Sequence, residues 1–313
     1  MKVKARAGFL LAASVLTAGF VAPASAGAQQ TPSPAVHQLS DSAAAKDFWT
    51  PADMRAATPL DGLVQTVNSL AGQVAGGLPS LIPSTPSSST PGSVWTGGGK
   101  VTKTAGRVFF LYNGAKASCS GDAVTSGNSS TVITAGHCVK LNGTWHTNWV
   151  FVPGYNNGNA PYGQWPAKKT MSTPQWAASE DLNYDVGAAV VDTVNGRRLT
   201  DVVGGQGIAF NQARGQRMYS FGYPAEVPYD GTKLDYCAGT TFTDYFGSND
   251  NGLNCDMTGG SSGGPWFQSF DSAAGTGVQN SVNSFGYNFL PGFMFGPYFG
   301  ADAQKLYNTA ASS

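Results

Sequence analysis

Short apolar runs broken by turn residues are the feature that most constrains the fold of this chain. From about Lys100 onward these runs alternate with Gly, Asn, Pro and Ser, and the 313 residues include 41 glycines. Such spacing favours strands and tight turns over helices, as a β-barrel or β-sandwich requires. The clearest strands are predicted at residues 107–112, 131–134, 149–152, 186–191 and 216–221. The sequence therefore predicts an all-β domain, with one short C-terminal helix over residues 301–307.

The first 26 residues have the composition of a secretory signal peptide. Three cationic residues precede an apolar run that ends near Phe20, and Ala24-Ser25-Ala26 supplies a small-residue cleavage pattern. A retained membrane anchor is the competing interpretation, but the run is short for a membrane span. We therefore expect residues 1–26 to be removed and the protein to be secreted, extracellular and unattached to a membrane.

Residues 27–98 differ in composition from the rest of the chain. They are rich in Ala, Ser, Pro and Thr, and residues 79–92 are typical of a flexible or polyproline-like linker. One face of a helix would be formed by Leu63, Val67, Leu70 and Val74. The segment is either a propeptide that packs on the domain or a disordered spacer, and we favour a propeptide that is largely flexible. The strand-rich domain is predicted at 99–313, with halves at 99–195 and 196–313.

Charge gives no indication of a nucleic-acid partner. The chain has 18 basic and 18 acidic residues and a formal net charge of zero. No basic patch argues for nucleic acid, and no acidic field argues for cationic ligands. We expect no nucleic-acid partner and a monomer.

Four cysteines fit an oxidising compartment: Cys119, Cys138, Cys237 and Cys255. They allow three pairings, among which the sequence alone does not choose. Pairing by proximity would give Cys119–Cys138 and Cys237–Cys255, each contributing roughly 3 kcal/mol of stability in the chain-entropy account. A zinc site is disfavoured because no Cys-x-x-Cys pair exists. We expect no metal and no cofactor, and the sequence leaves a structural calcium open.

Three short patterns carry residues suited to covalent hydrolysis. They are Thr134-Ala-Gly-His137-Cys138, Asp185-Val-Gly-Ala-Ala and Gly259-Gly-Ser-Ser262-Gly-Gly-Pro265. A serine hydroxyl is a weak nucleophile at neutral pH, so it needs a base, and the base needs an acid that fixes its tautomer. His137, Asp185 and Ser262 follow one another in an order known from serine peptidases. They are the candidate catalytic residues.

Other residues compete for the first two roles. His146 lies in a polar, turn-like context that predicts a surface position. Asp181 and Asp192 compete with Asp185, which alone leads directly into a run of small apolar residues. That run suits an acid held beneath an imidazole, so we favour Asp185.

The glycines around Ser262 have a chemical reason of their own. An oxyanion hole needs backbone N–H groups aimed at one point and close approach of the substrate to the main chain. We predict that Gly260 and Ser262 donate these two N–H groups. Ser261 competes with Ser262 for the nucleophile, but the sequence Ser-Gly-Gly-Pro favours Ser262.

Together these patterns resemble the catalytic blocks of the chymotrypsin-like (trypsin-type) serine peptidases. The Gly-Gly-Ser-Ser-Gly-Gly-Pro pattern and residues 148–157 are more similar to the bacterial secreted branch related to glutamyl endopeptidases. The resemblance covers roughly residues 100–305. It implies two six-stranded antiparallel β-barrels with the active site between them, and it favours a Cys119–Cys138 bridge beside the catalytic histidine.

One departure from the family concerns activation. Animal members carry an aspartate at the position of Ser261, which pairs with a newly freed N-terminal amine. Ser261 carries no charge, so we expect a zymogen activated by removal of a segment that blocks the cleft or assists folding. The mature N-terminus is expected between Gly92 and Gly106.

Three further expectations concern how the substrate is bound and selected. Asp256 lies six residues before Ser262, and it is either the pocket acid that receives Arg or Lys or a residue that braces a loop. Glutamyl-specific relatives use a histidine where this chain has Asn283, which cannot become a cation, so glutamate specificity is disfavoured. The backbone of Ser284, Phe285 and Gly286 is expected to pair with the substrate as an added antiparallel strand.

The sequence therefore predicts a secreted serine endopeptidase that acts on proteins or peptides through an acyl-enzyme. The alternative from another class is a non-catalytic binding protein on a protease scaffold. A lipase or esterase of the α/β-hydrolase type would need the order Ser, Asp, His and more helices than this chain predicts.

Overall fold

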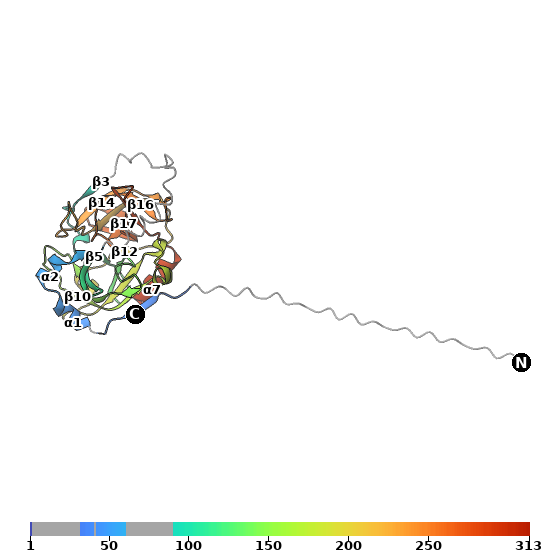
Figure 1. The fold of residues 1–313 in the computed structure, drawn as a ribbon, viewed down its shortest axis with the longest axis horizontal. Coiled ribbons are helices and arrows are strands. Elements are labelled where there is room, and N and C mark those ends of the chain that lie inside the picture. Colours follow the sequence, from blue (N-terminus) through green and yellow to red (C-terminus); the bar gives the residue numbers. More distant parts are fainter. Residues whose placement is uncertain (2–31, 41, 61–89) are drawn as a thin grey trace. The chain divides into compact units, whose positions relative to one another are not determined.

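Antiparallel strands close on themselves to form a barrel in the first half of the domain (Figure 1). In order around the barrel they are β9 (Thr147–Pro153), β4 (Ala105–Tyr112), β5 (Ala115–Ala123), β6 (Thr131–Thr134), β11 (Gly187–Val191) and β10 (Trp165–Ser172), and β10 pairs again with β9. Side chains alternate between the two faces of each strand. Val108 and Phe110 therefore belong to the interior cluster, and Phe109 between them belongs to a second cluster outside the barrel.

Residues 1, 32–40, 42–60 and 90–313 are the part of the chain that this computed structural model describes. The predicted signal peptide beyond Met1, the predicted helix around residues 63–74 and nearly all of the Ser/Pro-rich stretch lie outside it. From Pro32 to Ser313 the chain is one compact unit.

The second half of the domain is built from two sheets. One has the strand order β12 (Gly207–Ile208), β18 (Thr276–Val282), β17 (Pro265–Asp271), β13 (Arg217–Gly222), β14 (Asp235–Thr240) and β3 (Thr90–Val94). The other has the order β15 (Phe242–Thr243), β16 (Asn251–Asn254) and β19 (Phe293–Gly296). A disulfide between Cys237 of β14 and Cys255, directly after β16, ties the two sheets together. The predicted all-β, two-barrel class is confirmed, and the second barrel consists of two sheets rather than one closed ladder.

Short elements complete the domain. They are α4 (Val101–Thr104), β7 (Lys140–Leu141), β8 (Thr144–Trp145), α5 (Pro174–Ser179), the 3-10 helix η1 (Leu182–Tyr184), α6 (Leu199–Val203) and α7 (Ala301–Ala311). The predicted C-terminal helix is confirmed as α7, which buries Ala303, Leu306 and Ala310 in the same hydrophobic cluster as Val108 and Phe110. No helix among the described residues is long and apolar enough to cross a membrane.

The N-terminal segment from Pro32 to Leu60 packs on the first barrel. It contains β1 (Ala35–Gln38), which pairs with β10, two helices, α1 (Ser42–Phe48) and α2 (Pro51–Ala56), and β2 (Thr58–Pro59), which pairs in parallel with β5. Trp49 is 2% exposed, and its indole N–H donates to the Asn148 carbonyl at 2.8 Å. Trp49 and Met54 share the outer cluster with Phe109.

This packing differs in part from the largely flexible segment that composition suggested. A local signal was present, because Thr50 caps α2, Pro51 follows at the first helical position, and Asp53 completes a capping box. The two large apolar side chains Trp49 and Met54 then bury enough surface to hold the segment on the barrel.

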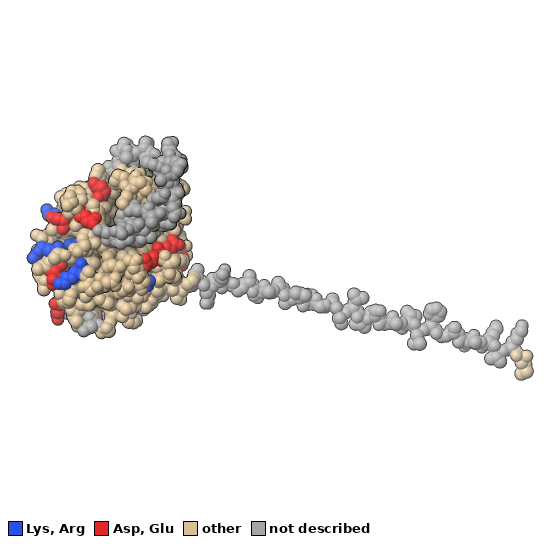
Figure 2. Space-filling model, viewed as in Figure 1, with Lys and Arg blue, Asp and Glu red and all other residues tan. Residues whose placement is uncertain are grey.

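Charged side chains are sparse on the surface. On the face shown in Figure 2, the Lys and Arg side chains lie close to Asp and Glu side chains, and most of that face carries no charge. Neither sign forms a continuous field there, in keeping with the zero net charge.

Candidate active site

His137 is held in the tight turn that follows β6. Gly136 is required beside it, because a Cβ at this position would lie 2.7 Å from the Trp176 ring and 2.9 Å from Asp185 Oδ1. The next residue, Cys138, is joined by a disulfide to Cys119 of β5. The turn is therefore fixed on two sides, and the His137 side chain is 1% exposed.

Asp185 binds His137 through both carboxylate oxygens. The His137 backbone N–H donates to Oδ1 at 2.8 Å, and His137 Nδ1 lies 2.7 Å from Oδ2. Ser284 Oγ donates to the same Oδ2 at 2.5 Å. The Asp185 side chain is fully buried, so these donors replace the water that a carboxylate would otherwise bind. The arrangement holds the imidazole with Nδ1 as the donor to Asp185.

Ser262 lies on the loop before β17, at the junction with the first barrel. Its carbonyl accepts the Ser120 backbone N–H at 2.7 Å, and Ser120 Oγ donates to the Gly260 carbonyl at 2.9 Å. Gly260 has φ +92°, and a Cβ there would lie 2.8 Å from the Tyr223 carbonyl oxygen, so only glycine fits. Among the described residues, the backbone N–H groups of Gly260 and Ser262 donate to no backbone carbonyl.

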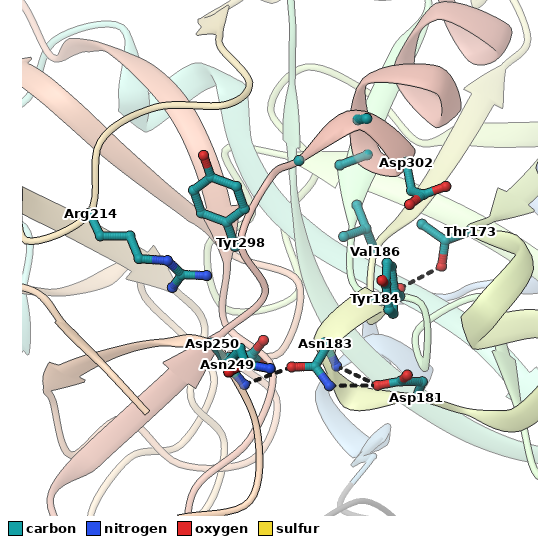
Figure 3. A pocket seen from close by; sticks show the side chains of 13 residues that line it. Thr173, Asp181, Asn183, Tyr184, Val186, Arg214, Asn249, Asp250, Tyr298 and Asp302 are labelled. Carbon is teal, nitrogen blue, oxygen red and sulfur yellow. Dashed lines mark hydrogen bonds between the residues drawn. The ribbon is translucent and has the colours of Figure 1, made fainter. Parts of the chain in front are cut away.

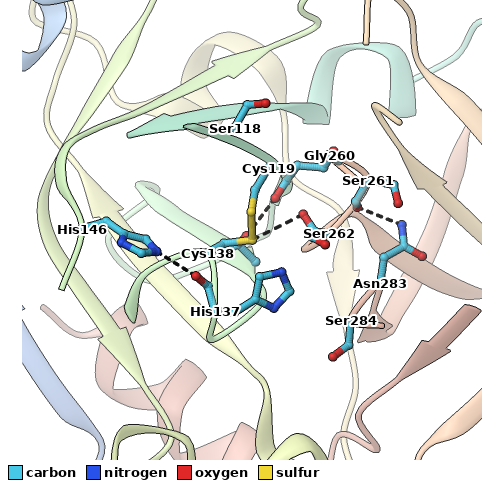
Figure 4. The surroundings of a disulfide bond; sticks show 12 residues. Ser118, Cys119, His137, Cys138, His146, Gly260, Ser261, Ser262, Asn283 and Ser284 are labelled. Carbon is cyan, nitrogen blue, oxygen red and sulfur yellow. Dashed lines mark hydrogen bonds between the residues drawn. A yellow bond between two sulfur atoms is a disulfide. The ribbon is translucent and has the colours of Figure 1, made fainter. Parts of the chain in front are cut away.

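A cleft of about 450 Å³ brings Ser262 and His137 together. Figure 4 shows both side chains between Ser118 on one side and Ser284 on the other. Within the described residues, Ser262 Oγ and His137 form no hydrogen bond. Such a bond often lengthens in an enzyme without substrate and tightens in the complex.

The four predicted substrate-binding residues line this cleft. Asp256, Ser284, Phe285 and Gly286 all contribute to it. The N–H groups of Ser284 and Phe285 donate to the Phe295 carbonyl, and Phe285 accepts the Phe295 N–H. Among the described residues, the Ser284 carbonyl and both backbone groups of Gly286 have no backbone partner. They are available to a peptide that lies along this edge.

Asn283 does not line the cleft. Its side-chain oxygen Oδ1 accepts the Ser220 hydroxyl and the Trp266 indole N–H, both at 2.7 Å, and its side-chain Nδ2 donates to the backbone carbonyls of Phe221 and Ser261. This buried amide is fully used in bracing the nucleophile loop.

Two carboxylates face the cleft near its mouth. Asp256 Oδ1 accepts the Gly92 backbone N–H at 2.8 Å and the Tyr229 hydroxyl at 2.7 Å. Glu226 Oε2 accepts the Gly259 N–H at 3.3 Å. Asp256 therefore braces a loop and also lines the cleft, and its role as the acid that receives Arg or Lys stays a prediction. No Lys or Arg is among the described residues of the lining.

The competing histidine has a structural position. The expectation that His146 lies at the surface is wrong, since the side chain is fully buried and stacks on Phe110 at 4.2 Å. Its Nε2 lies 2.8 Å from the His137 carbonyl oxygen. Burial lowers the pKa of His146 to about 4, so the ring stays neutral and supports the His137 turn.

The competing aspartates do not contact His137. Asp181 accepts hydrogen bonds from Asn183 at the start of η1, and Asp192 accepts the Ser42 hydroxyl. Asp181 lines a second cavity of about 390 Å³ beside the segment that leads into Asp185 (Figure 3). Asp250 lines the same cavity, and burial raises the pKa of its carboxyl well above the ordinary value.

Three contributions to the cleft have no signal in the sequence. Trp176 of α5 packs edge-on to the His137 ring, with the two ring centroids 6.2 Å apart. Ser120 of the first half donates its hydroxyl to the Gly260 carbonyl of the second half. Leu60, from the N-terminal segment, lines the cleft together with His137 and Ser262. All three depend on contacts between residues that are far apart in the chain.

Comparison with solved structures identifies the family. Protease Anisep from Arthrobacter nicotinovorans is 49% identical, and the match covers 67% of this chain and 96% of that one with a TM-score of 0.64. A thermostable serine protease, AL20, from an extremophilic microorganism is 44% identical over 68% of this chain and 99% of that one, with a TM-score of 0.65. A Glu endopeptidase shares the fold at 17% identity, covering 71% of this chain and 97% of that one, with a TM-score of 0.56.

Sequence comparison adds one shorter match. An extracellular metalloprotease of Bacillus subtilis is 40% identical over 62 residues, which is 20% of each chain. No family model matches. The solved relatives are matched over nearly their full length. The chain therefore belongs to the same family of serine peptidases as these two relatives, with a chymotrypsin-like fold that it shares with the Glu endopeptidase.

Proposed function

We propose that the chain is a secreted serine endopeptidase in which Ser262 is the nucleophile, His137 the general base and Asp185 the residue that orients it. The observation that carries this proposal is the 2.7 Å contact between His137 Nδ1 and the buried Asp185 carboxylate. With Nδ1 donating to Asp185, Nε2 is left as the proton acceptor. Ser262 lines the same cleft as that ring.

The reaction then proceeds through an acyl-enzyme. Ser262 Oγ attacks the peptide carbonyl carbon, and its proton passes to His137 Nε2. His137 returns that proton to the leaving amine, which breaks the peptide bond and leaves the acyl group on Ser262. Water, activated by His137, repeats the sequence and releases the acid. Asp185 holds the His137 ring in place and stabilises the imidazolium that forms.

The backbone N–H groups of Gly260 and Ser262 would stabilise the oxyanion. The proposal is supported by the lack of a backbone acceptor for either group among the described residues and by the positive φ of Gly260. A donor of this kind typically lowers the barrier by roughly 2.7–4 kcal/mol. The acyl side of the substrate would pair with the free backbone groups of Ser284 and Gly286 as an added strand.

The N-terminal segment is proposed to be a propeptide that keeps the enzyme a zymogen. Leu60 donates its backbone N–H to the Ser118 carbonyl at 3.3 Å and lines the cleft beside His137. A peptide substrate would need this strand edge, so it competes with the segment. Ser261 instead donates its hydroxyl to the Thr258 carbonyl and carries no charge for an activation ion pair. Export through a signal peptide at 1–26 fits the two disulfides.

The residues at the site do not fit a metal centre, despite the name of the Bacillus relative. Within the described residues, the metal-ligating atoms that cluster together belong to Cys119, His137 and Cys138. The two sulfurs are bonded to each other, and a metal needs the free thiolate. No step of the reaction is therefore assigned to a metal.

The test compares Ser262→Ala with Ser261→Ala. Both replace one hydroxyl in the same loop, and the Ser261 hydroxyl has a purely backbone partner. Wild type and Ser261→Ala should bind a fluorophosphonate covalently and cleave casein, whereas Ser262→Ala should do neither. Proteolysis that persists in Ser262→Ala would refute the assignment. A folded wild type that neither labels nor cleaves casein after removal of the N-terminal segment would favour the non-catalytic binding protein.

A further inference from the structure

A buried cation that the proposed reaction does not use lies beside the cleft. Arg107 of β4 is 1% exposed, and its Nη2 donates to Ser118 Oγ at 2.6 Å. Nη1 contacts the Gly231 carbonyl at 3.2 Å and the Met54 carbonyl at 3.5 Å. Its Nε has no hydrogen-bond partner, and no carboxylate within the described residues forms an ion pair with it.

The guanidinium is therefore held by three neutral oxygens and by the faces of two rings. Its central carbon lies 5.0 Å from the Phe109 ring and 5.1 Å from the Tyr155 ring. A buried charge is costly unless it is paired, and an arginine fork matches a carboxylate with two parallel hydrogen bonds. Arg107 has a donor for such a partner at Nη1, whose contact with the Met54 carbonyl is long at 3.5 Å.

Arg107 is connected through Ser118 to the edge of the cleft where the leaving-group side of the substrate would bind. Ser118, which accepts from the guanidinium, also offers its backbone carbonyl to Leu60, the residue that lies in the cleft. The next residue, Cys119, is bonded to Cys138 beside His137. Figure 4 shows Ser118 and Ser284 on opposite sides of Ser262. Since Ser284 belongs to the proposed acyl side, Ser118 belongs to the leaving-group side.

The N-terminal segment supplies part of the cover over this cation. Met54 of α2 contributes one acceptor, and β2 occupies the edge of β5 at Ala117 and Ser118. When that segment leaves, the Met54 carbonyl and the paired strand leave with it. The guanidinium then contacts Ser118, a residue of the strand edge that has become open on the leaving-group side.

We propose that Arg107 is a specificity-determining residue that selects peptides with an Asp or Glu side chain within the first three positions after the scissile bond. The inference rests on the proposed endopeptidase function and on release of the N-terminal segment. In the bound peptide, the acidic side chain takes the place of the Met54 carbonyl and forms an ion pair with the guanidinium at Nη1.

The test uses enzyme produced from the full chain, with its active fraction counted by fluorophosphonate labelling. Quenched peptides of one sequence carry Asp, Asn, Glu or Gln at each of the three positions in turn. We expect wild type to favour an acid over its amide by about tenfold in kcat/KM, at one position rather than at all three.

Three variants separate pairing from general attraction. Arg107→Met keeps the stem volume and should abolish the preference by lowering kcat/KM for the acid peptides to the level of the amide peptides, as expected for a loss of substrate pairing. Arg107→Lys keeps the charge without the fork and should retain part of the preference. Lys116→Gln is the matched control, because it removes a neighbouring β5 charge that pairs with Asp53 and should leave the preference intact.

The outcomes are distinct from those of the catalytic proposal. If wild type cleaves casein but treats acid and amide alike at all three positions, Arg107 is only structural and the inference is overturned, whether or not the variants fold. If Arg107→Met keeps the wild-type preference, the inference is also overturned. If Ser262→Ala still cleaves casein, the endopeptidase assignment itself fails.

Discussion

Ser284 Oγ donates to Asp185 Oδ2 at 2.5 Å, on the same oxygen that faces His137 Nδ1 at 2.7 Å. The two halves of the domain thus meet on one carboxylate, since Ser284 follows β18 and Asp185 precedes β11. A second donor on Oδ2 fixes the rotation of the carboxylate. Ser284 is therefore a positioning residue for the proposed base, in addition to its backbone role in the cleft.

Replacing Ser284 by alanine should lower kcat/KM by about tenfold, because a hydrogen bond to a buried charge is worth about 1.5–3 kcal/mol. Most of the loss should fall on kcat rather than KM, because a carboxylate that can rotate no longer holds the His137 imidazole in position. Ser281→Ala is the matched control, since that buried hydroxyl donates to the Pro297 carbonyl away from the triad. Steady-state kinetics on one peptide would show how the loss divides between kcat and KM, and an unchanged kcat in Ser284→Ala would contradict the positioning role.

The N-terminal segment should be anchored chiefly by Trp49. Replacing a buried tryptophan by alanine costs about 3–5 kcal/mol, so Trp49→Ala should loosen the segment and speed its removal. Phe48→Ala is the control, because Phe48 is 36% exposed on the same helix end. Processing of precursors in a Ser262→Ala background by added wild-type enzyme, followed on gels, measures the effect. Equal rates for the two variants would count against the anchoring role.

His146 should make stability depend on pH. In the unfolded chain it takes up a proton near pH 6.5, whereas in the folded protein its pKa is lowered to about 4. The unfolded state thus binds more protons between these values, so the free energy of unfolding falls as pH drops from about 6.5 toward 4. The loss is on the order of 3 kcal/mol for this group.

The comparison is between wild type and His146→Gln, both in the Ser262→Ala background to prevent autolysis. The glutamine amide keeps a donor for the His137 carbonyl but does not titrate. Urea unfolding at about pH 7 and pH 4.5 should show a smaller loss in the glutamine variant. Parallel losses in both proteins would rule out His146 as the group responsible.

The sequence predicted local features better than distant ones. The strand at 131–134 and its His137 turn were recognisable because the apolar run and its turn residues are adjacent in the chain. The contact between Ser284 and Asp185 spans 99 residues, and the one between Arg107 and Gly231 spans 124. No local pattern encodes such pairs, since they arise only when two barrels and the N-terminal segment pack together. His146 was misjudged for the same reason, because its polar neighbours hid a core position against Phe110.

Glutamate should be a poor residue on the acyl side of the scissile bond. The cleft carries Glu226 and Asp256, and no Lys or Arg is among its described lining residues, so a third carboxylate meets repulsion without a partner. We expect Glu to be cleaved about tenfold more slowly than Gln at this position, a difference of about 1.4 kcal/mol. Asp256→Asn should narrow the gap, and Asp250→Asn, in the second cavity, should leave it unchanged. Cleavage-site mapping on a peptide library measures all three proteins. Faster cleavage after Glu than after Gln in wild type would show that the two carboxylates do not determine the preference at this position. A preference for Arg or Lys that is lost in Asp256→Asn would make Asp256 the residue that receives them.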